Sequence, residues 1–380
     1  MEGLQRKTSH VALAPVARVA AVMGLLAQLH APVVHAQSRP ATSPASEHSP
    51  QSWVHESWTV KDGLPVNSIN TLLQDRAGYI WAATFDGLVR FDGIRFTVFN
   101  SANSEELPSN RIIQLKEGRD GSLWLVTEQG HVVRFHDGRF TNVAFETGKP
   151  SSGLAILFVD SLGSVWVGTP DGLWTVQGDR LVRVGRGTLD ARVTTIMQRR
   201  GGSVWVGTDR AGIFRVSSDH QVTKVETDPA VDMDFIIRLV EDEAGALWIG
   251  GNRGLWVLRD RVVQVKASQP LSLASIVVQV PATGAVFAQA SSGVYRIESD
   301  SAIPVAPGFS TNGLRLWTDA DAMWSVNGQD VFRDSQRVFT LPERRVVTGA
   351  LLMPLAVAWL EPKPERAPTH RAKARRAFPR

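Results

Sequence analysis

The chain has 380 residues, of which 43% are hydrophobic and 32 are glycine, enough for one large β-rich body with many turns. It contains no cysteine, which excludes disulfides, thiol catalysis and cysteine-ligated metal sites. The net charge of +4 is concentrated at the two ends, because residues 1–36 carry +2, residues 361–380 carry +5 and the remainder carries −3. A slightly acidic body offers no electrostatic footprint for nucleic acid, so we expect no nucleic-acid partner.

The first 36 residues have the pattern of a secretory signal peptide. Basic residues precede the apolar stretch 19–29, and Val34-His35-Ala36 places small residues before the expected cleavage point. The apolar stretch is too short to span a bilayer comfortably, which favours cleavage and predicts a periplasmic protein. Residues 37–52 are rich in Ser, Pro and Ala, and we expect a disordered leader there.

A unit with an aromatic anchor recurs seven times in the rest of the chain, at spacings of 37 to 43 residues. The anchors are Trp81, Trp124, Trp166, Trp205, Trp248, Phe287 and Trp324. A period near forty with four short strands per unit is typical of a propeller blade. The sequence therefore predicts an all-β, seven-bladed β-propeller of four-stranded antiparallel blades over residues 53–345, with these seven aromatic side chains as core anchors.

Each unit has the same internal order. An apolar run such as residues 69–73 opens it and suits a strand buried on both faces. In six of the seven units a glycine lies three residues before the aromatic anchor, and the seventh has Asp321 instead. Because glycine tolerates positive φ, we expect a tight turn at this position. Recurrent aspartates such as Asp92 mark the third turn, where they hydrogen-bond the local backbone.

Residues 58–60 parallel residues 96–98, since each triplet precedes a similar Leu-Pro sequence. This predicts that residues 58–60 form the outermost strand of a blade and complete the last blade of a closed ring. Residues 337–341 nevertheless give the seventh unit an outer strand of its own. One strand is then surplus, which favours a chain that once continued further.

Residues 346–360 are apolar and residues 361–380 form a basic tail that we expect to be disordered. One interpretation is a short membrane anchor followed by a basic cytoplasmic tail. A second is that residues 346–352 begin an eighth unit, which an unpatterned tail then interrupts. Truncated or out-of-frame sequence is the third alternative.

Three stretches carry a resemblance to a known family: residues 58–67, residues 74–81, and Phe85-Asp86-Gly87-Leu88-Val89-Arg90-Phe91-Asp92-Gly93. They resemble the two-component regulator propeller repeats of periplasmic input regions in bacterial sensor proteins, and the similarity extends over residues 53–341. The resemblance implies a propeller that senses a ligand for a histidine kinase or diguanylate cyclase. No kinase or cyclase motif occurs in this chain, so we expect an input module without output activity or cofactor.

In a propeller, the loops between second and third strands and the connections between blades lie at one end of the blades. The candidate ligand-binding residues at that end are Asn67, Phe85, Asp86, Asn110, Arg111, Glu128, Gln129, Asp171, Arg210 and Arg253. Two or more arginines with several amides suit a polyhydroxylated or anionic small molecule, such as an oligosaccharide fragment. The long connection 100–110 is a candidate recognition loop. The alternative is a ring of solvated loops with no ligand.

The sequence offers few residues for a catalytic site or a metal site. Apart from the two ends of the chain, only His131, His136 and His220 remain, on turns of different blades. We therefore expect no catalytic residues and no metal. A protein-interaction scaffold or a non-functional fragment of a longer sensor is the main alternative to a ligand sensor, and a propeller hydrolase or lyase is the third possibility.

Overall fold

The computed structural model describes residues 58–148, 155–227, 229–232, 234–272, 276–280 and 283–305, and then six strands between residues 315 and 362. Residues 1–56 and 57–380 form two separate units. The description below concerns the second unit alone. The signal peptide and the leader that the sequence predicts lie outside the described residues.

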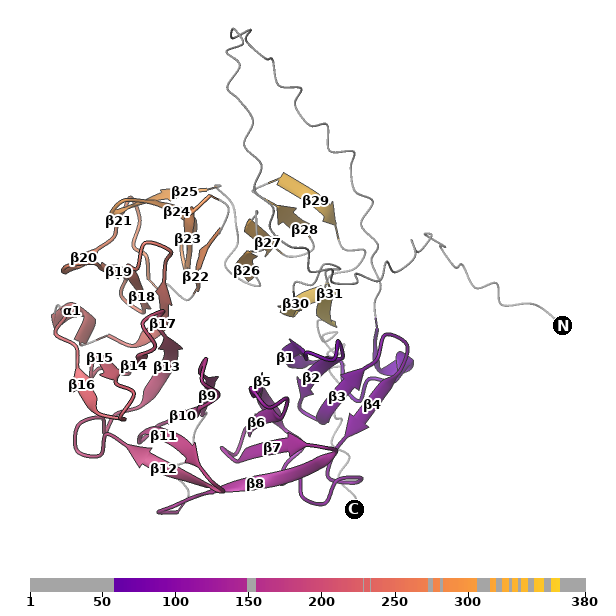
Figure 1. The fold of residues 1–380 in the computed structure, drawn as a ribbon. Helices are drawn as coiled ribbons and strands as arrows, with labels where there is room; N and C mark the ends of the chain where they lie inside the picture. Colours follow the sequence, from indigo (N-terminus) through magenta and orange to yellow (C-terminus); the bar gives the residue numbers. More distant parts are fainter. Residues whose placement is uncertain are drawn as a thin grey trace, which may run out of the picture. The chain divides into compact units, whose positions relative to one another are not determined.

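The strands of this unit form consecutive antiparallel groups of four, which we call repeats 1 to 7 in chain order (Figure 1). Repeat 1 comprises β1 (Ile69–Gln74), β2 (Ile80–Thr84), β3 (Gly87–Phe91) and β4 (Phe96–Phe99). Repeat 2 comprises β5 (Ile112–Glu117), β6 (Leu123–Thr127), β7 (Val132–His136) and β8 (Arg139–Phe145). Repeat 3 comprises β9 (Ile156–Val159), β10 (Val165–Thr169), β11 (Gly172–Gln177) and β12 (Arg180–Val184). Repeat 4 comprises β13 (Val193–Gln198), β14 (Val204–Thr208), β15 (Ile213–Val216) and β16 (Val222–Lys224).

The later repeats follow the same order. Repeat 5 comprises β17 (Ile236–Glu241), β18 (Leu247–Gly251), β19 (Leu255–Leu258) and β20 (Val262–Gln264), preceded by the short helix α1 (Pro229–Asp232) and followed by β21 (Lys266–Ala267). Repeat 6 comprises β22 (Ile276–Gln279), β23 (Val286–Ala290), β24 (Gly293–Glu298) and β25 (Ser301–Pro304). Repeat 7 comprises β26 (Arg315–Thr318), β27 (Met323–Asn327), β28 (Asp330–Arg333) and β29 (Gln336–Thr340), and the hairpin β30 (Arg345–Leu351) and β31 (Val357–Pro362) comes after it.

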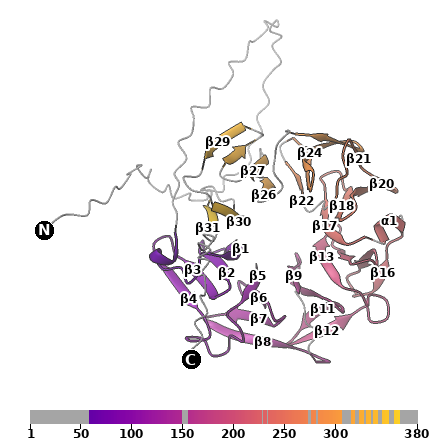
Figure 2. The ribbon, with the colours of Figure 1, turned by 180° about the vertical axis from the view of Figure 1, so that it is seen from behind.

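Neighbouring repeats meet through their first strands. β1 contacts β5, β5 contacts β9, and the same relation continues to β26, while β30 contacts β1. Repeats 2 and 3 are also joined at their outer strands, because β8 and β12 pair in parallel through Ala144 with Arg180 and Phe145 with Leu181 (Figure 2). These two repeats therefore form one continuous eight-stranded sheet.

The strand that is buried on both faces is the second of each repeat, not the first as the sequence analysis expects. Every residue of β2, β6, β10, β14 and β18 is buried, whereas the first strands are only partly buried. The second strand has a strand on each side within its own sheet and a repeat on each face, whereas the first strand lies at the edge of its sheet. The aromatic anchors of these five strands are 2 to 7% exposed. Phe287 in β23 is partly buried, and the side chain of Trp324 lies outside the description.

The tight turn expected before each anchor is confirmed in the first six repeats. Its glycines all adopt positive φ, between 66° and 93°. They are Gly78, Gly121, Gly163, Gly202, Gly245 and Gly284. Asp321 of the seventh unit lies outside the described residues.

The N-terminal segment does not form the outer strand that we expected from residues 58–60. Val60–Asp62 is a 3-10 helix, η1, in which Thr59 and Asp62 form a capping box and Gly63 ends the helix at φ 108°. The Trp58 ring packs against Phe91 and Phe96 of repeat 1, at 5.1 and 6.5 Å between ring centroids. The segment therefore covers β3 and β4 of repeat 1. It forms a helical turn and not a strand because its capping residues favour the turn.

The outer strand expected at residues 337–341 is present as β29, and the apolar residues 346–360 lie partly in β30 and β31. These two strands pair with each other, from Arg345 with Pro362 to Leu351 with Val357. Among the described residues, none of the helices has the length and apolar character required to cross a bilayer.

Candidate functional site

The two ends of each repeat differ in composition. We call the end with the loops between second and third strands and the connections between repeats the loop end. The other end, with the remaining two turns of each repeat, is the turn end. All of the ligand-binding candidates from the sequence lie at the loop end, but the structure brings only five of them together.

These five residues form a cluster across repeats 1 and 2. The Arg111 guanidinium lies 4.2 Å from the centre of the Phe85 ring and forms a two-pronged ion pair with Glu128, whose longer contact is 3.1 Å. The Asn110 amide donates to the Asp86 carboxylate at 3.4 Å. Arg111 and Glu128 remain 45% and 42% exposed. The hydrogen bond between them raises the pKa of Arg111 and lowers the pKa of Glu128. The Arg111–Glu128 pair is therefore ionised at neutral pH, and its two charges satisfy each other.

The long connection 100–110 is held by its own side chains. Asn103 accepts from the Asn100 N–H at 2.9 Å, Asn110 accepts from the Ser101 N–H at 2.7 Å, and the Leu107 side chain is 2% exposed. The buried Leu107 side chain and the hydrogen bonds to the asparagine side chains make this loop a structural link between repeats 1 and 2.

The other candidates lie apart from the cluster. Asn67 accepts a hydrogen bond from the Val60 N–H at 2.9 Å and so fixes the N-terminal helix. Arg210 and Arg253 are linked through the buried Asp234, which accepts their backbone N–H groups at its carbonyl and carboxylate oxygens, both at 2.9 Å. Gln129 is an exposed residue of the loop that contains Glu128. Asp171 lies at a different place, beside a hollow in repeat 3.

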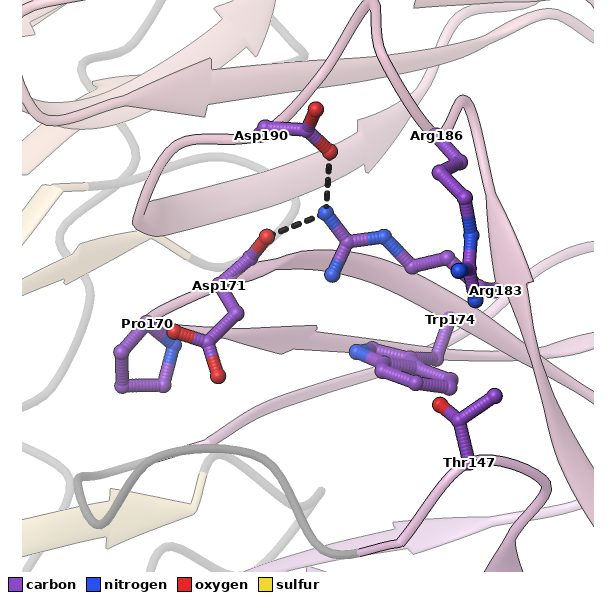
Figure 3. A pocket seen from close by; sticks show the side chains of 7 residues that line it. All are labelled: Thr147, Pro170, Asp171, Trp174, Arg183, Arg186 and Asp190. Atoms are coloured by element: carbon purple, nitrogen blue, oxygen red, sulfur yellow. Dashed lines mark hydrogen bonds and ion pairs between the residues drawn. The ribbon is translucent and has the colours of Figure 1, made fainter.

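This hollow has a volume of about 440 Å³ and opens at the loop end of repeat 3 (Figure 3). It is lined by Thr147, Pro170, Asp171, Trp174, Arg183, Arg186 and Asp190. The β8–β12 pairing brings Thr147 of repeat 2 to the Trp174 side of the hollow, and Phe145 packs edge-on against Trp174 at 4.9 Å. The hollow thus depends on the continuous sheet of repeats 2 and 3.

Arg183 is the central residue of the hollow, and its side chain is only 8% exposed. Its Nη2 donates to the carbonyl of Leu189 at 3.0 Å, to the carboxylate of Asp190 at 2.7 Å, and to the carbonyl of Asp171. Its Cζ lies 5.4 Å from the Trp174 ring centre. In the described structure its buried Nε has no hydrogen-bond partner. The arginine therefore ties both walls of the hollow together.

The connection 185–190 is rigidly built. Asp190 accepts the Gly187 N–H at 2.9 Å through its second oxygen, and the Leu189 N–H bonds the Gly185 carbonyl at 2.7 Å. Leu189 is fully buried. Gly172, at φ 137°, leaves room for the Arg183 guanidinium, which any Cβ at this position would overlap. The hollow is therefore preformed.

Sequence reasoning found Asp171 but missed Trp174, Arg183, Arg186 and Asp190. The rule that selected Asn110 and Arg111, in the connection after repeat 1, applies equally to the connection after repeat 3. The Gly185-Arg186-Gly187 sequence is the signal, because both glycines adopt positive φ, 69° and 81°, and present the arginine between them.

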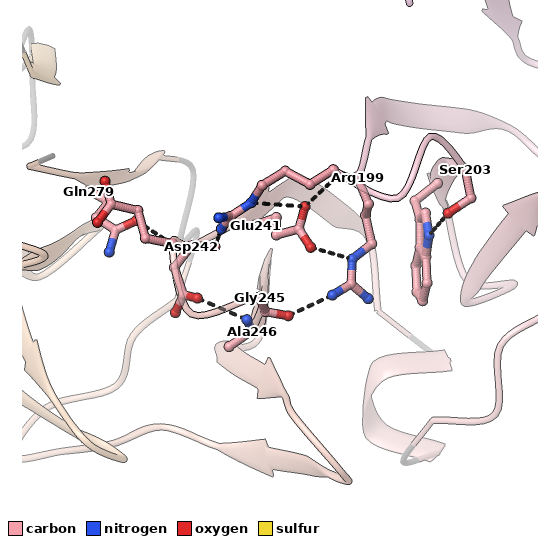
Figure 4. Close-up of polar contacts among 10 residues, drawn as sticks. Arg199, Ser203, Glu241, Asp242, Gly245, Ala246 and Gln279 are labelled. Carbon is pink, nitrogen blue, oxygen red and sulfur yellow. Dashed lines mark hydrogen bonds and ion pairs between the residues drawn. The ribbon is translucent and has the colours of Figure 1, made fainter. Parts of the chain in front are cut away.

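The turn end carries a different set of polar residues, which joins one repeat to the next (Figure 4). A Glu or Gln at the end of the first strand accepts a backbone N–H from the first turn of the preceding repeat. The four pairs are Glu117 with Arg76 at 3.3 Å, Gln198 with Ser161 at 2.7 Å, Glu241 with Arg200 at 2.7 Å and Gln279 with Glu243 at 2.7 Å. Glu241 also pairs with the Arg199 Nε at 2.9 Å and is 10% exposed. We call these contacts the repeat clasps.

Three tryptophan anchors are also held at the turn end. Their indole N–H groups donate to an aspartate six residues earlier, at 2.6 to 2.9 Å. The pairs are Trp81 with Asp75, Trp166 with Asp160 and Trp248 with Asp242. The buried N–H is thereby satisfied, which makes these carboxylates structural.

The three histidines of the repeats do not gather. His131 lies at the loop end of repeat 2, His136 lies in the last turn of the same repeat, 3.5 Å from Asp137, and the His220 ring packs on Trp166 at 5.2 Å. Over the described ranges, no group of three potential metal ligands occurs.

Two cations on first strands have lowered pKa values. Desolvation by the surrounding protein lowers the pKa of Lys116 on β5, and the charge of Arg238 on β17 lowers it further. Desolvation also lowers the pKa of Arg238.

Comparison with known proteins confirms the family resemblance. Residues 63–86 match the two component regulator propeller family. A comparison with curated protein sequences finds no match. The fold is similar to the extracellular domain of a hybrid two-component system of B. thetaiotaomicron, with 19% identity and a TM-score of 0.52 over 77% of this chain and 44% of that chain.

Two further structures show the same fold. One is a catalytically inactive virginiamycin B lyase from Staphylococcus aureus with quinupristin, at 12% identity and a TM-score of 0.51 over 70% of this chain and 94% of that chain. The other is PorZ, a surface component of the type-IX secretion system of Porphyromonas gingivalis, at 15% identity and a TM-score of 0.50 over 70% of this chain and 46% of that chain. At these identities the likeness concerns the fold. The chain is a β-propeller that carries, at residues 63–86, a repeat of the two component regulator propeller family.

Proposed function

We propose that this chain is the ligand-binding input module of a bacterial signal-transduction protein and that a cleavable signal peptide exports it to the periplasm. The observation that carries the proposal is the family repeat at residues 63–86, which coincides with the first hairpin, β1 and β2, of repeat 1. The fold shared with the extracellular domain of a two-component system supports the same role. A bound ligand can transmit a signal only if it binds one conformation of the protein more tightly than another.

The ligand in this proposal is a small polar molecule, polyhydroxylated or anionic, that binds at the loop end. The hollow of repeat 3 supports this location, because its walls are fixed by Arg183 and Asp190 before any ligand arrives. A preformed site loses less conformational entropy on binding than a site made of mobile loops. The cluster around Arg111 is a weaker candidate, since its charges already neutralise each other.

We further propose that the seven repeats close into one seven-bladed ring. The contacts between successive first strands support closure, and β30, which contacts β1, stands between repeat 7 and repeat 1. In this arrangement the hairpin β30–β31 lies at the junction as an additional pair of strands.

A thermal-shift screen of the purified protein against oligosaccharides, organic acids and amino acids tests the sensor role. A ligand of the folded state raises the melting temperature with concentration, following RT ln(1 + [L]/Kd). One cooperative transition that no compound moves contradicts the sensor role and favours a scaffold or a fragment of a longer sensor. N-terminal sequencing of the protein from a periplasmic extract tests export, with Gln37 as the expected first residue.

A propeller lyase is the second candidate, and the fold shared with virginiamycin B lyase is the observation that favours it. Incubation with quinupristin followed by mass spectrometry tests this directly. Because the described histidines lie at three separate places, we expect intact quinupristin. Conversion of quinupristin to a product would replace the sensor proposal with an enzymatic one.

A further inference from the structure

The hollow of repeat 3 contains charged groups that differ in how far they are already paired. It contains two arginines and two aspartates. Asp190 is already used on both oxygens, by Arg183 and by the Gly187 N–H. Arg186, in contrast, has neither an ion pair nor a hydrogen bond to any residue that the structure describes, and its residue is exposed. The uncommitted cation of the hollow is therefore Arg186.

The two sides of the hollow differ in charge. Figure 3 shows Arg186 on the side opposite Pro170, and the Asp171 carboxylate beside Pro170. The Arg183 guanidinium lies between them, and its Nη2 bonds leave its buried Nε without an acceptor. A molecule that fills the hollow thus meets the Arg186 guanidinium at one end and the Asp171 carboxylate at the other.

We propose that the hollow binds a small organic carboxylate whose other end donates hydrogen bonds, with the ligand carboxylate on Arg186 and the donor on Asp171. This inference rests on the proposed ligand-binding role and names the ligand class for it. Guanidinium and carboxylate groups form strong, charge-assisted hydrogen bonds with defined geometry. The Asp171 carboxylate has several lone pairs and accepts hydroxyl or ammonium donors.

The preformed connection 185–190 is the reason why we expect the site to distinguish carboxylates from molecules without a carboxylate. Gly185 packs against Val222 of repeat 4, and Asp190 fixes Gly187, so the backbone on both sides of Arg186 is held in place. The ligand must order only the Arg186 side chain. Molecules of the same size that lack a carboxylate form no ion pair with the Arg186 guanidinium and should bind more weakly.

Isothermal titration calorimetry with two matched pairs of compounds tests the inference. D-glucuronate and L-alanine carry the carboxylate with hydroxyl and ammonium donors, respectively. D-glucose and L-alaninamide keep the donors and lack the carboxylate. We expect at least one carboxylate to bind roughly tenfold or more tightly than its partner without the carboxylate, and the preference to weaken with salt. The pair that responds distinguishes an acidic sugar from an amino acid.

The variant Arg186→Gln should weaken carboxylate binding by roughly tenfold and leave the weak binding of the partner without the carboxylate unchanged. Arg180→Gln is the matched control, because it removes the same charge at the turn end of β12, the strand that precedes Arg186, where Arg180 is 66% exposed. Unchanged melting temperatures for both variants show that each is folded.

Equal binding of the two members of each pair, or full affinity in Arg186→Gln, overturns the inference. If none of the four compounds binds but an oligosaccharide from the wider screen does, the carboxylate assignment is wrong and the sensor role stands. If nothing in either set binds, both proposals fail.

Discussion

The turn end and the loop end of the repeats follow different rules. At the turn end the same contacts recur: a Glu or Gln clasps the preceding turn in four junctions, and an Asp holds a tryptophan N–H in three repeats. At the loop end every repeat differs, from the Arg111 cluster to the hollow around Arg183. Repeated contacts stabilise the stack of repeats, and the varied end is left free to bind.

The junction between repeats 2 and 3 shows how the two ends are coupled. Val159 occupies the clasp position there and its side chain cannot accept a hydrogen bond, and the outer strands β8 and β12 pair directly. That pairing also places Thr147 at the hollow. Of the five junctions between repeats 1 to 6, the one without a clasp is therefore the one at which the described hollow forms.

Removing the clasp at Glu241 should have the largest effect on stability. Glu241→Ala leaves the Arg199 guanidinium, which is 23% exposed, without its ion-pair partner and frees the Arg200 N–H. Breaking a largely buried pair by deleting one partner costs about 3 kcal/mol. Urea denaturation followed by tryptophan fluorescence measures the loss. The matched control Glu298→Ala removes an exposed partner of Arg296 and should cost less than about 1 kcal/mol. Equal losses would contradict the distinction between clasp and surface pair.

Losing the aspartate of a tryptophan anchor should have the next largest effect. Asp242 is 8% exposed and accepts from the Trp248 indole at 2.8 Å and from the Ala246 N–H at 2.8 Å. Asp242→Ala leaves both buried donors unpaired, so the free energy of unfolding should fall by about 2 kcal/mol. Asp260→Ala, at an exposed turn of the same repeat, should change it by no more than about 0.5 kcal/mol. A smaller loss in Asp242→Ala than in this control would show that the anchors do not depend on the carboxylate.

Most of the regular turn end can be predicted from the sequence, because the sequence signals for its turns are local. A turn glycine three residues before an aromatic anchor predicts the hairpin without knowledge of any distant contact, and six glycines at positive φ confirm it. The Asp-to-Trp spacing of six residues was equally visible, yet only the structure explains it. The wrong prediction of a strand at residues 58–60 also has a local cause. Thr59 and Asp62 form a capping box that favours a helical turn, and composition alone does not reveal it.

The hollow was not accessible in the same way. Arg183 reaches the carbonyls of Asp171 and Leu189, and Thr147 arrives from another repeat through the β8–β12 pairing. Neither relation follows from the repeat pattern, because both depend on how a connection folds back over the neighbouring sheet. Of the residues that line the hollow, the sequence analysis selects only Asp171, because it lies in a loop between second and third strands.

Acid should act on the turn end through Asp120. Burial alone would raise its pKa, but hydrogen bonds from Ser122 and the nearby Arg134 lower it to about 2. The folded-state pKa lies below the ordinary value of 3.8, so the ionised carboxylate stabilises the fold above that value. This contribution is lost as the pH falls from 3.8 towards 2. The stability difference between the natural protein and Asp120→Asn should therefore shrink over this range when urea midpoints are compared. A difference that is independent of pH would exclude Asp120 as its source.

The smallest effect should come from the loop-end ion pair. Arg111 and Glu128 are nearly half exposed and satisfy each other, so Arg111→Gln should leave the melting temperature unchanged within error. Its consequence should be confined to titration: without the Arg111 hydrogen bond, the pKa of Glu128 returns towards its ordinary value. NMR titration of the Glu128 carboxyl in both proteins measures this change. A marked loss of stability in Arg111→Gln would mean that this part of the loop end, like the turn end, holds the repeats together.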